Sequence, residues 1–154
     1  MRKSIAAILM ILFAFQTSAL CGLGKRATMY VGGTVTSIPE KTEGVSSTAS
    51  ESEFIFQYKG GKLAIPYNKI ETLEYGQHAG RRVGLAIVVA WPLLFSKKRR
   101  HYLTVGFLDS EGKKQAAVFE LGKEVTRTTL ASLEARTGKK VEYEDEEARK
   151  AGNK

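Results

Sequence analysis

The stretch "EFIFQYKGGKLAIPY", residues 53–67, decides the fold because it predicts a β-hairpin by itself. Aromatic side chains occupy every second position from Phe54 to Tyr58, which is the period of a strand. Gly60-Gly61 supplies the turn, since glycine adopts a positive φ without steric cost. Pro66 should lie at the end of the second strand or at a sheet edge, because proline cannot donate a ladder hydrogen bond.

A second hairpin is predicted from "HYLTVGFLD" and "KQAAVFELG", between His101 and Gly122. The compact turn sequence Asp109–Gly112 joins its two strands. In the first strand, Leu103, Val105 and Phe107 share one face. We expect this apolar face to be the buried one.

The apolar period lengthens to nearly four in residues 123–140. Val125, Thr129 and Leu133 lie four apart, which predicts a one-sided amphipathic helix. Gly138 should end this helix, as a glycine in the left-handed conformation commonly does.

Three further segments complete the order of elements. Residues 28–38 predict a strand, and Gly32-Gly33 indicates a bulge within it. Residues 39–52, rich in Ser, Thr and Glu, predict a loop or a ragged strand interrupted by one. Residues 68–76 predict a short strand, with a single helical turn as the alternative. Mainly antiparallel strands followed by one C-terminal amphipathic helix give an α+β domain.

The succession "KLAIPYNKIETLEYG", "HYLTVGFLDSEGKKQAAVFELG" and "VTRTTLASLEARTGKK" resembles bacterial PH-like and GRAM-like domains. Such domains often show an I-P-Y-x-x-I step, here Ile65 to Ile70, then two strands joined by a D-x-x-G turn and a closing helix. The resemblance implies a half-open antiparallel barrel capped by one helix, and it implies binding without catalysis. It places the PH-like domain at residues 28–143, although the apolar run around residues 84–95 departs from a minimal core. The charged residues 144–154 predict a disordered tail.

The N-terminus has the pattern of a secretory signal peptide, residues 1–20. Arg2 and Lys3 precede an apolar run from Ile5 to Phe15, whose 11 residues are fewer than the roughly 20 that span a bilayer. The small residues up to Ala19 predict cleavage after that position, and hence an exported protein, periplasmic or secreted. An uncleaved anchor is one alternative. Lipidation at Cys21 is another, and the residues before Cys21 fit that pattern poorly.

Positive charge gathers in one place. The chain has 24 Lys and Arg against 16 Asp and Glu, a formal net charge of +8, and loss of the leader lowers it to about +6. No acidic residue lies between Glu74 and Asp109, and six basic residues in that gap flank the uncharged run Val83–Phe95. We call residues 81–100 the apolar-basic segment. Its candidate membrane- or partner-binding residues are Arg81, Arg82, Trp91, Leu93, Leu94, Phe95, Lys97, Lys98, Arg99 and Arg100.

Several interpretations of this segment are open. The run from Leu85 to Trp91 can be a buried strand or short helix that Pro92 ends. It can instead be a peripheral membrane element, whose bulky apolar residues lie at the interface while the basic residues meet anionic lipid. It can also be a docking surface for another protein. Nucleic acid is the least favoured partner.

We predict no catalytic, cofactor-binding or metal-binding residues. The sequence has no G-x-S-x-G, H-E-x-x-H or P-loop motif, and His78 and His101 have no third ligand at metal spacing. We therefore expect an exported, non-catalytic binding module that associates with a membrane surface or an envelope protein through the apolar-basic segment. The alternative is an envelope structural or assembly protein that self-associates through the same segment.

Overall fold

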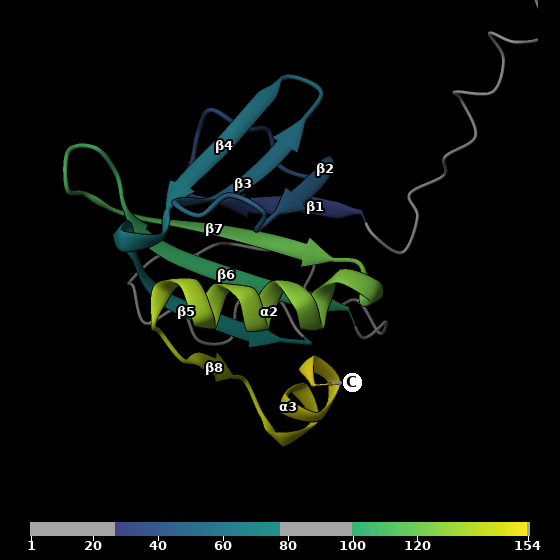
Figure 1. Ribbon diagram of the computed structural model, residues 1–154. Helices are drawn as coiled ribbons and strands as arrows, with labels where there is room; N and C mark the ends of the chain where they lie inside the picture. Colours follow the sequence, from purple (N-terminus) through teal and green to yellow (C-terminus); the bar gives the residue numbers. More distant parts are fainter. Residues whose placement is uncertain (1–26, 78–99, 154) are drawn as a thin grey trace, which may run out of the picture.

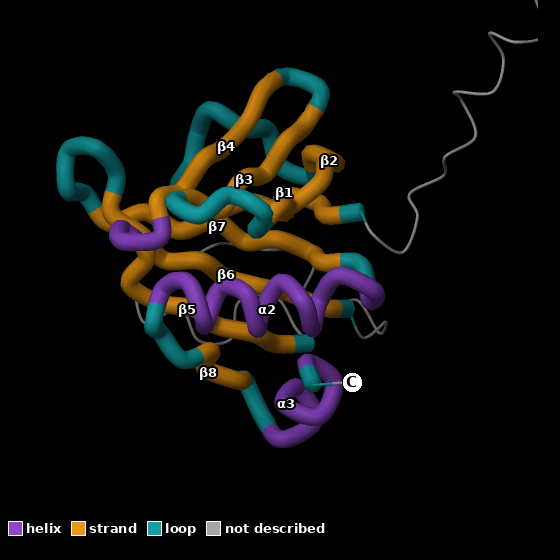
Figure 2. Tube along the Cα trace, in the orientation of Figure 1, coloured by secondary structure: helices purple, strands orange, loops and turns teal. Residues whose placement is uncertain are grey.

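The computed structural model describes residues 27–77 and 100–153, which form one open sheet with two α-helices (Figures 1 and 2). The strands are β1 (Thr28–Gly33), β2 (Thr42–Ser47), β3 (Glu53–Tyr58), β4 (Gly61–Pro66), β5 (Ile70–Gly76), β6 (His101–Leu108), β7 (Lys114–Leu121) and β8 (Val141–Tyr143). The helices are α2 (Lys123–Thr137) and α3 (Glu146–Gly152), and Tyr67–Lys69 form a 3₁₀ turn, η1. The strand order is β4-β3-β2-β1-β7-β6-β5-β8, in which only β5 and β8 are parallel. The α+β class and the mainly antiparallel sheet are confirmed.

The first predicted hairpin is β3–β4. Phe54 pairs with Ile65, and the Phe54 and Phe56 side chains are fully buried. Their rings meet Phe119 of β7 at centroid distances of 5.5 and 5.2 Å. β4 is an edge strand, so Pro66 at its end leaves no ladder bond unmade. The hairpin thus forms one wall of the main core.

β1 carries the predicted bulge and connects the two halves of the sheet, because it pairs with both β2 and β7. Its register with β7 shifts between Tyr30 and Gly32. Gly33 has a φ of +147°, and a Cβ there would lie 2.1 Å from the carbonyl oxygen of Ala116. Glycine therefore permits both the backbone conformation and the close approach of β1 to β7.

Two segments follow the alternatives left open by the sequence. Within residues 39–52, the ragged strand is present as β2, and Ser46 is hydrogen-bonded to Thr28 of β1 at 2.7 Å. Residues 67–76 hold both expected forms, because η1 leads directly into β5.

The second predicted hairpin is β6–β7. Its turn is held by the Asp109 carboxylate, which accepts the backbone N–H groups of Glu111 and Lys113, both at 2.9 Å. The Gln115 side chain donates to the same carboxylate. These hydrogen bonds lower the pKa of Asp109, the one from Gln115 most, so the turn keeps its ionised acceptor near neutral pH.

Strands β1, β7 and β6 are buried on both faces of the sheet. The predicted apolar face of β6, which carries Leu103, lies in the main core, and we call it the inner face. The opposite face, which we call the outer face, is buried as well, with Tyr102 5% and Val118 2% exposed. The sequence analysis expected burial on one face only.

Helix α2 lies over the inner face (Figure 1). The predicted amphipathic helix is confirmed, since its buried residues are Thr126, Thr129, Leu130 and Leu133. Gly138 adopts the left-handed conformation with φ 68°, and its N–H donates to the Glu134 carbonyl at 2.9 Å. The predicted end of the helix is confirmed too. Within the described ranges, no helix reaches the length and apolar character needed to cross a bilayer.

Residues Glu146–Gly152 form a second helix, α3, within the segment 144–154 for which the sequence analysis predicted a disordered tail. Asp145 caps α3 by accepting the Ala148 N–H at 2.6 Å. Ala148 is fully buried, and a Cβ on Gly152 would lie 3.3 Å from the Tyr75 ring. These two small residues lie four apart and share one helix face. The residues around Ala148 and Gly152 are mostly charged, so the local sequence did not indicate that this helix packs on the domain. Two small residues are enough for that contact.

We expect Phe119→Ala to lower the free energy of unfolding by about 3–5 kcal/mol, because the substitution leaves a cavity where three aromatic rings meet. Tyr30, Phe54 and Phe56 all contact the Phe119 ring. Urea denaturation measures the change. Val45→Ala is the control, since Val45 is 59% exposed and should shift stability by less than about 0.5 kcal/mol.

We expect Ala148→Asp to lower stability by about 1–3 kcal/mol, because a carboxylate at this buried position detaches α3 from Tyr75 and Leu130. Thermal or urea unfolding is the measurement. Ala131→Asp, at an exposed position of α2, is the matched control. Equal stability of the two variants would mean that residues 144–153 contribute nothing to the domain.

Candidate functional site

The apolar-basic segment is inserted between two paired strands. β5 ends at Gly76, β6 begins at His101, and Gly76 pairs directly with Tyr102. The chain therefore leaves the sheet and returns to it at neighbouring points. Of the candidate binding residues, the structure describes Arg100. The other nine lie outside the described ranges: Arg81, Arg82, Trp91, Leu93, Leu94, Phe95, Lys97, Lys98 and Arg99.

Arg100 is held within the domain by an ion pair. Its Nη1 donates to both carboxylate oxygens of Glu120, at 2.9 and 2.7 Å. The hydrogen bond to Glu120, and then the charge of that carboxylate, raise the pKa of Arg100. Glu120 is in register with Tyr102, so it belongs to the outer face. Arg100 therefore reaches β7 across the outer face, and its charge is already paired.

Two further contacts fix the ends of the inserted segment. At the return end, the Tyr75 hydroxyl is hydrogen-bonded to Nδ1 of His101, and the two rings stack at a centroid distance of 6.1 Å. At the other end, the Gln77 N–H donates to Oε2 of Glu144 at 3.1 Å. Burial, and then the nearby charge of Lys123, lower the pKa of His101. Both ends of the insertion are thus anchored to the body of the domain.

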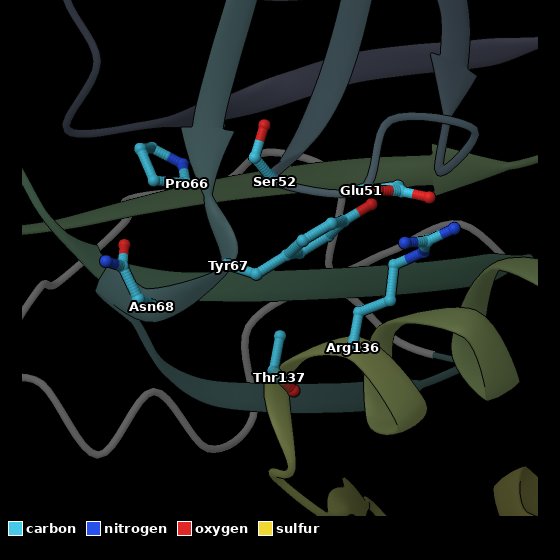
Figure 3. Close-up of a pocket in the computed structure, with 7 residues that line it drawn as sticks. All are labelled: Glu51, Ser52, Pro66, Tyr67, Asn68, Arg136 and Thr137. Carbon is cyan, nitrogen blue, oxygen red and sulfur yellow. The ribbon is translucent and has the colours of Figure 1, made fainter.

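A pocket of about 500 Å³ lies at the opposite end of β5, where the loop before β3, η1 and the last turn of α2 meet (Figure 3). Figure 3 shows the Arg136 side chain extending from α2 toward the Tyr67 ring and Glu51. The Arg136 guanidinium carbon lies 5.7 Å from the ring centroid, within cation–π range. The lining residues are Glu51, Ser52, Pro66, Tyr67, Asn68, Arg136 and Thr137.

Tyr67 organises this pocket. Its backbone N–H donates to the Ser52 carbonyl at 2.9 Å, and its hydroxyl donates to the Ser50 carbonyl at 3.2 Å. Burial raises the pKa of Tyr67, and the charge of Arg136 opposes that shift. The hydroxyl stays protonated and holds the loop in place. The pocket thus offers a cation over an aromatic face, suited to holding a polar group.

Sequence reasoning did not bring Tyr67 and Arg136 together as a site. It placed Tyr67 in the I-P-Y step, and Arg136 lies in the last turn of α2, where a cation suits the carbonyl end. Only the packing of α2 beside η1 makes them neighbours, and no spacing in the sequence signals that contact. Among the described residues, no three His, Cys, Asp or Glu side chains gather as a metal site.

Positive charge is concentrated in the inserted segment. Residues 78–99 contain five basic residues and no acidic one. The rest of residues 21–154 contains 17 Lys and Arg against 16 Asp and Glu, which is close to neutral. Most of the positive excess therefore lies in residues 78–99.

Comparison with protein-family models gives no match, and comparison with curated proteins gives no significant relative.

We expect the protein to lose stability as the pH falls from 7 to 5, in part through His101. Its folded-state pKa lies below the ordinary value near 6.5, so the unfolded chain binds the proton first and acid favours unfolding. The contribution of His101 is complete above that ordinary value and is lost below it. Urea denaturation at several pH values should show a shallower pH dependence for His101→Gln. An unchanged slope would contradict this role.

Proposed function

We propose that the chain is an exported, non-catalytic binding module of PH-like build that attaches to an anionic envelope surface through the apolar-basic segment. One observation carries the proposal. Residues 78–99, inserted between β5 and β6, hold five basic residues and no acid, whereas the rest of residues 21–154 is nearly neutral, with 17 Lys and Arg against 16 Asp and Glu.

The topology supports the PH-like part of the proposal. β1 to β7 follow an antiparallel order in which β1 pairs with β7, while β4 and β5 do not pair. A sheet of this order is open between β4 and β5, which is compatible with a half-open barrel. Helix α2, directly after β7, contributes Leu130 and Leu133 to the core between the two halves of the sheet. One helix covering the open side is the arrangement that the resemblance implies.

The insertion supports the binding part. Its two ends leave the sheet side by side, and contacts to Glu120, Tyr75 and Glu144 fix them. The segment with the five basic residues is therefore joined to the domain at one end of the sheet. Each basic residue close to an anionic membrane contributes about 1 kcal/mol of attraction, so the group contributes several kcal/mol at low salt. Arg100 is excluded from this sum because Glu120 already pairs with it.

We expect the purified protein to sediment with vesicles that contain anionic phosphatidylglycerol, to ignore neutral phosphatidylcholine vesicles, and to dissociate at high salt. Lys97→Glu with Lys98→Glu should weaken binding more than tenfold, because two attractive charges become repulsive. Vesicle cosedimentation over a lipid titration measures the change.

The matched control is Lys139→Glu with Lys140→Glu, which makes the same change of net charge at two exposed lysines of the α2–β8 connection. This control should bind nearly as the wild type does. If both variants lost vesicle binding equally, net charge alone and not the position of the lysines would determine binding. Equal binding of the wild type to anionic and neutral vesicles would exclude electrostatic attachment. An oligomer that forms without lipid and is lost in Lys97→Glu with Lys98→Glu would favour the alternative, self-association through the segment.

A further inference from the structure

A second apolar cluster lies on the outer face of the sheet, separate from the main core. It consists of Val31 on β1, Tyr102 on β6 and Val118 on β7, with Met29 packed against it. Val31 is 0% exposed, Tyr102 5% and Val118 2%. Side chains on one face of a sheet become this inaccessible only when another layer of protein covers them.

The described elements that could form such a layer lie on the other side. Both helices contribute their buried residues to the main core, through Leu130 and Leu133 of α2 and Ala148 of α3. The loop after β1 does the same through Ile38. Figure 1 shows α2 and α3 on the same side of β5, β6 and β7. Within residues 27–77 and 100–153, the outer cluster contains sheet residues alone.

We infer that residues 83–95, the apolar run of the inserted segment, pack across the outer face over Val31, Tyr102 and Val118. The run contains 13 residues and no charge. Extended, it spans about 43 Å, whereas three neighbouring strands are crossed in about 10–15 Å, so its length is ample even if part of it coils. The uncharged, mainly apolar run is suited to packing on the apolar cluster of the outer face.

One described residue beside the insertion, Arg100, supports the same location. Arg100 binds Glu120, which lies on the outer face because it is paired with Tyr102. The first described residue after the insertion thus contacts the outer face. Because both ends are attached to the sheet, the run is held at a high effective concentration beside this face, which a separate molecule does not share.

The inference goes beyond the proposed function and does not depend on it. It assigns the apolar part of the segment to the interior of the domain, including Trp91, and leaves the basic residues at both ends for an anionic surface. A membrane that took up the apolar run directly would leave the outer face without its cover.

Trp91 is the only tryptophan of the chain, so its fluorescence reports on this run directly. In the purified protein without lipid, we expect blue-shifted emission and several-fold weaker quenching by iodide and acrylamide than in the urea-unfolded chain. Both properties should be independent of protein concentration. Ready quenching of Trp91 until vesicles are added would overturn the inference in favour of lipid, and shielding that disappears on dilution would overturn it in favour of a second copy.

Substitutions on the outer face then test whether the run that contains Trp91 packs there. Val118→Asn and Thr104→Glu should red-shift the Trp91 emission and increase its quenching, whereas Val45→Asn, on exposed β2, should change neither. Far-UV circular dichroism confirms that each variant is folded, and Thr104→Glu, at the position paired with Val118, serves if Val118→Asn unfolds. Folded outer-face variants with unchanged Trp91 shielding would refute the inference. Vesicle binding by the same proteins is scored separately, so the attachment proposal can fail while this one holds.

Discussion

The close approach of β1 to β7 at Gly33 joins the two halves of the sheet, and the other contacts of the core follow from it. β2, β3 and β4 reach the rest of the sheet only through β1. The bulge between Tyr30 and Gly32 increases the local twist, so the β3–β4 hairpin turns toward the inner face. Phe54 and Phe56 then meet Phe119, and the remaining open side is where α2 packs. A side chain at Gly33 would push against the Ala116 carbonyl at the joint itself.

Much of this fold could be predicted from local patterns. Both hairpins, the bulge, the amphipathic helix and its glycine end were predicted, because alternation, glycine conformation and helical period act over a few residues. What failed depended on distant contacts. α3 was missed because Ala148 and Gly152 bury small surfaces against Tyr75 and Leu130, partners that the local composition does not reveal. The Tyr67–Arg136 pocket was missed for the same reason.

The two-sided burial of β1, β7 and β6 was present in the sequence but was interpreted too narrowly. "MYV" and "AAVF" are continuous apolar runs, not alternating ones, and such runs are typical of strands covered on both faces. In β6, burial was expected for the face of Leu103, Val105 and Phe107 and not for the face of Tyr102 and Thr104. A tyrosine ring buries a large apolar surface while its hydroxyl can remain at the edge of the buried region. The sequence analysis therefore underestimated the burial of Tyr102.

The inserted segment then combines two physical effects, apolar packing within the domain and electrostatic attraction to a surface. If the apolar run completes the outer layer of the domain, attachment to a surface rests on the basic residues alone. Such attachment is electrostatic, weakens within a screening length of roughly 8 Å at physiological salt, and reverses readily. The rest of the chain is nearly neutral, so attraction acts mainly at the inserted segment, and the domain would be oriented with its inserted end toward that surface and the Tyr67–Arg136 pocket, at the opposite end of β5, facing away. Positive charge that is concentrated at one end of the sheet can therefore position the pocket toward the surrounding solvent without any apolar insertion.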